Sequence, residues 1–449
     1  MKRLTILPVA VLTLAGFILS DGLTSPLHSQ VVAHDLRTRN MELVGYNGEV
    51  ATKTPELIQL VVQGDYAYIG SVYGPAGLFI LDISDPRNPT LIAEFPQEDA
   101  ETHDVKVNEE GTIAVLANGP VRPRAEGEEQ EEWWEEMLEI SHFGLTLVDI
   151  SDKRNPKLLS RWENRDSEGK PAQCHNVEIH GDFVYCTGLW FSDRGLVILD
   201  ISDPTRPEEV ATIGPPQVEG TEREDLPRWA KPGVWIHDIY LQPHPGLDRV
   251  LGYAAWWDGG LRVYDLTDPA APEERVNWSW AELGPAGQNT YFVKPTPSGR
   301  LVVVGPAWGA SGAWGFSTGF LSILDLSSPD RAELVSTWSI PGHDWQSREQ
   351  QSESGLWWFP GNFDVTEERI YLANYSAGVW VIDISDPADP YAVANFGPES
   401  FRPPPPKPEG PTFWGEGYPY VHTVEEQDGL IYALDVKSGL YILRVTEER

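Results

Sequence analysis

The sequence contains few cysteines and few basic side chains. Only Cys174 and Cys186 are present, so at most one disulfide can form within the chain. Lys and Arg together number 33 against 68 Asp and Glu, which gives a formal net charge of -35. Because nucleic acids and anionic membrane surfaces are bound by clustered Lys and Arg, this balance argues against both as partners.

Several catalytic signatures are also missing. The chain has no Gly-Xaa-Ser-Xaa-Gly elbow, no phosphate-binding loop and no His-Glu-Xaa-Xaa-His motif. Carboxylates paired for glycoside cleavage do not stand out among the 68 acidic residues. A functional site therefore has to be sought in other patterns.

The one long apolar run lies at the N-terminus. Residues 4–19 follow Lys2 and Arg3 and precede polar residues, which is typical of a secretory signal peptide. The run is short for a membrane anchor, and no Cys follows it that could carry a lipid. We predict a signal peptide at residues 1–22 and a secreted or periplasmic protein with no membrane span after its removal.

A short phrase recurs along the rest of the chain. Residues 195–204 read Gly-Leu-Val-Ile-Leu-Asp-Ile-Ser-Asp-Pro, and seven related copies begin at Gly77, Gly144, Gly195, Gly260, Gly319, Gly378 and Gly439. The apolar run is too short for a helix and rich in Val and Ile, so it predicts a buried strand. The turn follows because Asp bonds its own downstream backbone and Pro withholds an N–H.

Each copy is preceded by a predicted hairpin and followed by one further strand, which makes four strands per unit. Seven such units predict an all-β, seven-bladed β-propeller. The last copy has no following strand, whereas residues 41–46 form a strand ahead of the first hairpin. We expect this strand to complete the C-terminal blade and close the ring. The domains are then a tail at 23–40 and the propeller at 41–449.

The repeated phrases at residues 81–85, 199–204 and 382–387 resemble those of the LVIVD-repeat family of exported propeller proteins. The resemblance covers residues 41–449. It implies the propeller fold and export, and it leaves the function to the individual site residues.

The long connections are expected on one face of the ring, at residues 119–143, 214–236, 305–317, 341–362 and 397–421. Within the first, residues 126–139 predict a short acidic helix docked by its Trp and Leu side. The connections are rich in Trp, and disorder disfavours so many aromatics. We therefore predict an aromatic-lined cavity under these loops, with candidate substrate-binding residues Trp235, Trp256, Trp257, Trp308, Trp357, Trp358 and Trp414.

One position of the innermost strands is dominated by histidine. Aligning the seven units on their hairpin turns gives the column Ile58, His103, His175, His237, Asn289, Phe363 and His422. Four imidazoles converging on the ring axis could hold a transition metal ion, with Cu, Fe and Zn as candidates, and leave a position open for substrate. The placement is similar, by architecture only, to the axial histidines of carotenoid-cleaving oxygenases and of the selenium-binding-protein type of methanethiol oxidase.

A structural role is the alternative for this column. The residues that follow it are polar in every unit, which predicts that they tie neighbouring blades together: Gln59, Asp104, Asn176, Asp238, Thr290, Asp364 and Thr423. The histidines could do the same by bonding a neighbouring backbone. Because three blades lack the histidine, whereas a locking device should recur in all seven, the pattern favours a functional column.

Two hypotheses for function follow. In the first, the protein is a metalloenzyme, oxidoreductase-like or a metal-assisted lyase or hydrolase, acting on a small apolar or aromatic molecule. His343, Tyr418 and Tyr420 are then candidates for proton transfer. In the second, the aromatic mouth is a non-catalytic binding module for a glycan or a protein partner.

The two cysteines lie on the arms of one predicted hairpin. Counting from its turn at residues 181–182 places Cys186 opposite Val177, three positions from Cys174. Export would permit a disulfide, but this register does not favour one.

Overall fold

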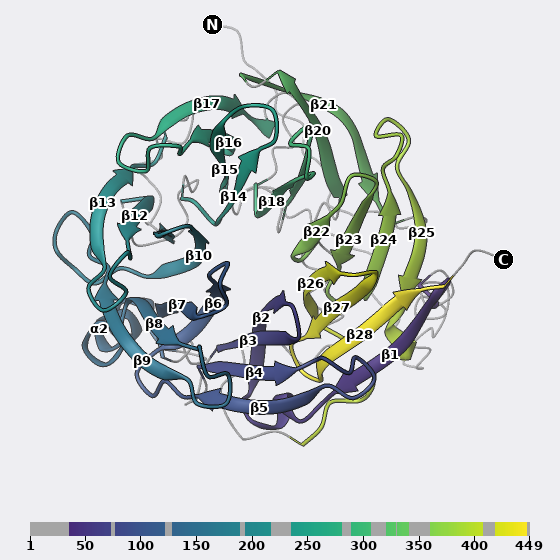
Figure 1. The fold of residues 1–449 in the computed structure, drawn as a ribbon, viewed down its shortest axis with the longest axis horizontal. Helices are drawn as coiled ribbons and strands as arrows, with labels where there is room; N and C mark the ends of the chain where they lie inside the picture. Colours follow the sequence, from purple (N-terminus) through teal and green to yellow (C-terminus); the bar gives the residue numbers. More distant parts are fainter. Residues whose placement is uncertain are drawn as a thin grey trace, which may run out of the picture. The chain divides into compact units, whose positions relative to one another are not determined.

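Seven four-stranded antiparallel sheets stand around a common axis in the computed structural model (Figure 1). It describes residues 36–72, 77–121, 128–188, 194–216, 235–280, 289–306, 320–328, 330–340, 360–406 and 418–446. The predicted all-β, seven-bladed propeller is confirmed. The predicted signal peptide lies outside the described residues. No helix in the described ranges is long and apolar enough to cross a membrane.

The blades are numbered in chain order, and their strands run from the axis outward. Blade 1 holds β2 (Glu56–Gln63), β3 (Tyr66–Val72), β4 (Leu78–Asp82) and β5 (Thr90–Phe95); blade 2 holds β6 (Glu101–Val107), β7 (Ile113–Gly119), β8 (Gly144–Asp149) and β9 (Lys157–Glu163); blade 3 holds β10 (Cys174–His180), β11 (Phe183–Gly188), β12 (Leu196–Asp200) and β13 (Glu208–Ile213). Blade 4 holds β14 (Asp238–His244), β15 (Arg249–Trp256), β16 (Gly260–Asp265) and β17 (Glu273–Trp278); blade 5 holds β18 (Phe292–Pro295), β19 (Leu301–Gly305), β20 (Phe320–Ser328) and β21 (Arg331–Ser339). Blade 6 holds β22 (Phe363–Val365), β23 (Arg369–Ala373), β24 (Val379–Asp383) and β25 (Tyr391–Phe396); blade 7 holds β26 (Val421–Gln427), β27 (Leu430–Asp435), β28 (Gly439–Val445) and β1 (Met41–Asn47).

The ring is closed by the first strand of the chain. β1 pairs antiparallel with β28, from Met41 opposite Val445 to Asn47 opposite Leu440, and lies at the outer edge of blade 7 (Figure 1). The closure predicted from the missing strand is confirmed. It leaves the last blade with four strands like the other six.

The glycine of the repeated phrase is required by its backbone. Gly260 and Gly378 both have φ +79°, a left-handed conformation that other residues adopt at a cost. A Cβ on either residue would also overlap the carbonyl oxygen of Trp278 or Phe396 at the end of the outer strand. The Asp of the phrase makes the predicted turn, since the Ser202 amide donates to Asp200 Oδ1 at 2.8 Å.

The inner strands carry β-bulges where the histidine column lies. The register shifts between Leu57 and Leu60, between Thr102 and Asp104, between Cys174 and Val177, and between Val421 and Thr423. A bulge adds a residue to one strand and changes which face the following side chains occupy. Ile58, His103, His175 and His422 therefore lie at irregular points of otherwise regular strands.

The bulge in β10 corrects the expectation about the cysteines. Cys186 does lie opposite Val177, as counted from the turn, but Cys174 pairs with Gly188 because of the extra residue. Cys174 and Cys186 therefore face the same core cluster, with Cα atoms 5.4 Å apart, and are disulfide-bonded. Straight counting failed because it assumed an unbroken two-residue alternation.

The predicted acidic helix is also confirmed. α2 (Gln130–Ile140) buries Met137, and the Trp134 ring lies 5.5 Å from the Phe143 ring in edge-on contact. Two short 3-10 helices, η1 (Val50–Thr52) and η4 (Pro398–Ser400), complete the described elements.

Candidate functional site

Histidines from several blades meet at one end of the axis. The ring centroids of His103 and His175 are 3.7 Å apart, and those of His175 and His237 are 4.5 Å apart. His422 joins the group from blade 7, and its charge interaction with His103 lowers its pKa. Four of the seven inner strands thus deliver an imidazole to the same place. We call His103, His175, His237 and His422 the histidine cluster.

Each imidazole is also tied to its surroundings by at least one hydrogen bond. His103, His237 and His422 are hydrogen-bonded to the backbone of His175, Tyr291 and Ile58, each in the next blade around the ring. The His175 Nδ1 atom lies 2.6 Å from Asn176 Oδ1. Among the described residues, the Nδ1 atoms of His103 and His237 are buried and have no hydrogen-bond partner.

Burial keeps the cluster neutral. It lowers the pKa of His103 to about 4 and, together with the charge of His103, the pKa of His422 to about 3. Burial first, and then the neighbouring imidazoles, lower the pKa of His175 and His237 well below the usual value. A neutral imidazole is the form that binds metal ions.

Aromatic side chains enclose the cluster. The His237 ring lies 3.8 Å from the Tyr291 ring and 5.8 Å from the Trp257 ring, and the His422 ring lies 5.6 Å from the Tyr375 ring. Trp257, Tyr375, Tyr420 and Val436 form one buried group, against which Trp235 and Tyr291 pack. We call Trp235, Trp257, Tyr291, Tyr375 and Tyr420 the aromatic roof.

Two members of the roof have strained backbones. Trp257 and Tyr375 have φ of +31° and +32°, which bulky residues rarely adopt. Each lies in the turn between the second and third strands of its blade, and each bridges to the start of the next inner strand, at Thr290 and Val421. Such strain persists only where the surroundings enforce it, and it clusters at functional sites.

The structure places some of the other candidate residues beside the histidine cluster and others away from it. Trp235 and Trp257, the candidate substrate-binding residues, lie in the roof, and so does Tyr420, a candidate for proton transfer. Trp256 does not, because it is the last residue of β15 and its side chain packs in the core between blades 3 and 4. Tyr418 is also away from the cluster, since its hydroxyl bonds the Arg402 carbonyl oxygen and Ser438 in the outer part of blade 7. His343, Trp308, Trp357, Trp358 and Trp414 lie outside the described residues.

Sequence reasoning missed Tyr291 and Tyr375. Tyr291 follows the polar column residue Thr290, and Tyr375 precedes Ser-Ala-Gly in a turn that matches Trp257-Asp-Gly-Gly in blade 4. Aligning the turns between second and third strands, as well as the inner strands, would have indicated Tyr375.

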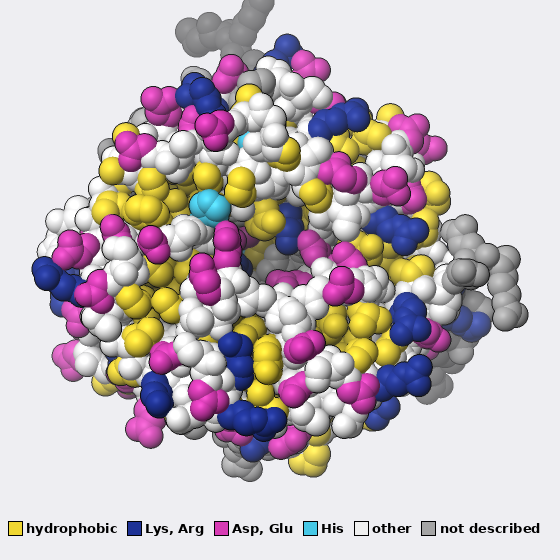
Figure 2. All heavy atoms as spheres, in the orientation of Figure 1, with side chains coloured by type: hydrophobic (Ala, Val, Ile, Leu, Met, Phe, Trp, Pro, Cys, Tyr) yellow, Lys and Arg dark blue, Asp and Glu magenta, His cyan; other side chains and the backbone are white. Residues whose placement is uncertain are grey.

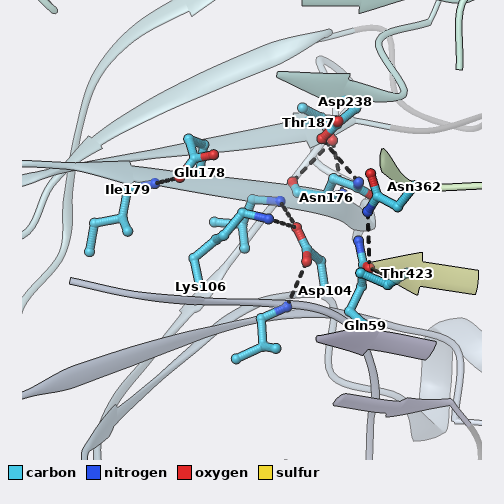
Figure 3. Close-up of polar contacts among 12 residues, drawn as sticks. Gln59, Asp104, Lys106, Asn176, Glu178, Ile179, Thr187, Asp238, Asn362 and Thr423 are labelled. Atoms are coloured by element: carbon cyan, nitrogen blue, oxygen red, sulfur yellow. Dashed lines mark hydrogen bonds and ion pairs between the residues drawn. The ribbon is translucent and has the colours of Figure 1, made fainter. Parts of the chain in front are cut away.

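The polar column ties the blades together, as predicted (Figure 3). Four of its hydrogen bonds run between neighbouring inner strands: from the Val177 amide to Asp104 Oδ2 at 2.9 Å, from Asn176 Nδ2 to Asp238 Oδ1 at 3.1 Å, from Thr423 Oγ1 to Gln59 Oε1 at 2.6 Å and from the Glu426 amide to Asp364 Oδ2 at 2.8 Å. Thr290 instead accepts a bond from Trp280 Nε1, just after the outer strand of blade 4, at 2.8 Å. In blade 6, Asn362 adds a bond to Gln59 Oε1 at 3.1 Å. These bonds fix the positions of the column residues next to them.

The four imidazoles are suitable ligands for a transition metal ion, but the distances between their rings fit a shared ion less well. Buried neutral imidazoles, two with an unbonded nitrogen, are ligands for Cu, Fe or Zn. Two imidazoles bound to one ion at about 2.0–2.1 Å would hold their centroids about 4.5–5 Å apart. The His175–His237 distance of 4.5 Å fits this, and the His103–His175 distance of 3.7 Å is shorter. Among the described residues, no three His, Cys, Asp or Glu side chains are placed to hold a metal ion.

Comparison with known proteins gives the family. The model of the LVIVD repeat matches residues 58–96, 140–163, 172–213 and 362–396, on four of the seven blades. The chain is an LVIVD-repeat β-propeller protein. No curated protein matches this LVIVD propeller.

Solved structures share the fold of the LVIVD propeller. A periplasmic gluconolactonase from Pseudomonas aeruginosa is 12% identical with a TM-score of 0.53, over 76% of this chain and 85% of its own. A protein from Lactobacillus plantarum is 11% identical with a TM-score of 0.53, over 77% and 84%. At such identities the likeness shows the propeller fold alone, a fold that is compatible with an enzyme.

Proposed function

We propose that this LVIVD propeller is an exported metalloenzyme whose histidine cluster binds a transition metal ion next to a small-molecule site under the aromatic roof. One observation carries the proposal: the imidazoles of His103, His175 and His237 stack against one another with His422 near them, and two of these rings keep a buried nitrogen without a partner. A buried polar atom left unbonded costs about 1–3 kcal/mol. Metal binding would offset that cost.

The chain's own residues supply the rest of the site. His103, His175, His237 and His422 would hold the ion, which supplies a Lewis acid or an oxygen-activating centre when bound. Asn176 orients the His175 ring through Nδ1, leaving Nε2 for the ion. The faces of Trp257, Tyr291 and Tyr375 favour a small apolar or aromatic substrate and exclude water.

Proton transfer is assigned to the Tyr420 hydroxyl and to His343. Tyr420 is fully buried in the roof, and Lys437 Nζ lies 4.6 Å from the centre of its ring. Tyr418 is dropped from this role because its hydroxyl is engaged elsewhere.

Elemental analysis of purified protein tests the proposal. We expect close to one equivalent of Cu, Fe or Zn, lost in a His175→Ala/His237→Ala variant and kept in the control His244→Ala, a histidine in the β14–β15 turn. Added metal should also raise the unfolding temperature of the stripped wild type and not of the double variant. Metal-free protein whose unfolding temperature none of the three ions changes would contradict the proposal.

The second candidate is a metal-free binding module, and the contacts of the cluster favour it in one respect. His103, His237 and His422 each bond the backbone of the next blade, which is what a blade-locking role requires. The roof would then stack on a glycan or anchor a protein partner. Quenching of tryptophan fluorescence by a sugar, unchanged by metal removal and lost in Trp257→Ala, would support this function over the first.

A further inference from the structure

A cavity lies along the axis of the ring. Its volume is about 270 Å³, and the inner strands of all seven blades line it. It runs from Asp238 and Thr423, which follow His237 and His422, to Gln63 and Glu425 near the tight turns. Figure 2 shows a hollow at the centre of the ring with acidic side chains around it and a basic side chain within.

Carboxylates outnumber cations around this cavity. Lys294 Nζ is paired with Asp364 Oδ1 at 2.7 Å, and Lys106 Nζ lies 3.5 Å from Asp104 Oδ2. Three further carboxyl groups line the cavity, those of Glu178, Asp238 and Glu425. Backbone amides donate to Glu178 and Glu425, and Asn176 donates to Asp238. Within the described residues none of the three forms an ion pair, so the cavity carries excess negative charge once these carboxyl groups are ionised.

Part of the wall between these groups is apolar. Val61, Phe292 and Val424 contribute to the lining beside the carboxylates. No three acidic groups in the described ranges are close enough to hold one metal ion. The complementary ligand therefore has positive charges separated by a hydrocarbon segment, which lets it meet dispersed carboxylates and contact the apolar wall at once.

We propose that this axial cavity binds a small aliphatic amine, held through its ammonium groups by Glu178 and Glu425. Neither Glu178 nor Glu425 belongs to the histidine cluster, and the proposal does not depend on whether the cluster binds metal. The ligand would enter from the face that carries the tight turns, opposite the long loops.

The electrostatics of Glu425 support this assignment. Burial raises its pKa to about 7, against the lowering effect of Lys294 and Lys106, while Asp364 raises it further and the Val62 amide lowers it. Burial likewise raises the pKa of Glu178, with Lys106 and Lys294 opposing and Asp104 adding to the shift. A bound ammonium favours the ionised carboxylates, so binding should release protons near neutral pH and tighten as pH rises from 6 to 8.

Titration calorimetry with 1,4-diaminobutane tests the proposal, with 1,4-butanediol as the uncharged ligand of matched length. The diamine should bind, the diol should not, and the heat should vary with the ionisation enthalpy of the buffer. Glu178→Gln and Glu425→Gln should each weaken binding by roughly tenfold or more. Glu426→Gln is the matched control, because the Glu426 carboxylate bonds the Gly429 amide and does not line the cavity.

Circular dichroism melts would show that the Gln variants remain folded. Equal binding of diol and diamine, preferential binding of the dicarboxylate succinate, or an unchanged affinity in the Glu178→Gln/Glu425→Gln protein would each overturn the assignment. The wild-type comparison of diamine with diol decides the question even if a variant does not fold.

Discussion

At the residue scale, the histidine cluster combines two roles that the sequence presents as alternatives. Each imidazole has a fixed contact with its surroundings, yet the four rings also converge. The polar neighbours Asp104, Asn176, Asp238 and Thr423 do much of the locking between inner strands, which leaves the histidines less needed for it. This division matches the sequence, where the polar column occurs in every blade and the histidine in four.

The neutral histidines predict acid sensitivity of the metal-free protein. Burial sets the pKa of His103 to about 4 and that of His422 to about 3, whereas histidines of the unfolded chain titrate near 6.5. Between these values the unfolded chain binds protons that the folded protein excludes. The contribution of these neutral histidines to the free energy of unfolding is therefore complete above pH 6.5. It is lost as the pH falls toward 4, by about 1.4 kcal/mol per pH unit for each histidine.

Urea unfolding at pH 4.5 to 7.5 measures this slope. His422→Gln should reduce the slope of the free energy of unfolding against pH by the equivalent of about one bound proton. His244→Gln, at the end of β14, should leave that slope unchanged. A His422→Gln protein with the wild-type slope would show that His422 is protonated in the folded state.

At the scale of elements, a single bulge in an inner strand has two effects. In β10 the bulge lies at His175, whose side chain faces the axis. The same bulge places Cys174 on the same face of the sheet as Cys186. The disulfide thus joins β10 to β11 next to the residue that contributes a histidine to the cluster. Strand register and site geometry are linked at this point of the chain.

We expect the disulfide to stabilise blade 3 measurably. The bonded cysteines are 12 residues apart, and closing a loop of this size stabilises a fold by about 3 kcal/mol through the entropy of the unfolded chain. Cys174→Ala/Cys186→Ala should lower the free energy of unfolding by about this amount. Reductant should destabilise the wild type and leave the double variant unaffected, and equal sensitivity of both proteins would contradict the bond.

At the scale of the whole molecule, the repeat predicts the architecture almost completely. The Gly-to-Pro phrase recurs because its glycine and aspartate each meet a local backbone requirement, and the count of strands fixed the closing role of β1. The candidate site was less predictable. The histidines could be aligned, but the orientation of Trp256 and the charged axial cavity depend on side chains from separate blades meeting in space, which no local pattern encodes.

Ring closure predicts that removing β1 destabilises the whole propeller. Deleting residues 36–47 exposes the outer edge of β28 and the hydrophobic core of blade 7, where Met41 is buried. We expect a lower unfolding temperature and self-association, measured by calorimetry and sedimentation. A synthetic peptide of residues 36–52 should restore the temperature, and a truncated protein as stable as the full chain would refute the closing role of β1.

The pairing of β1 with β28 also sets the order of events during biosynthesis. β1 leaves the ribosome long before its partner β28, because the other six blades lie between them in the sequence. Blade 7 can therefore assemble only after those six blades have been synthesised. Until then the nascent chain carries an unmatched strand ahead of blade 1, so the ring cannot close while the intervening blades are still being made.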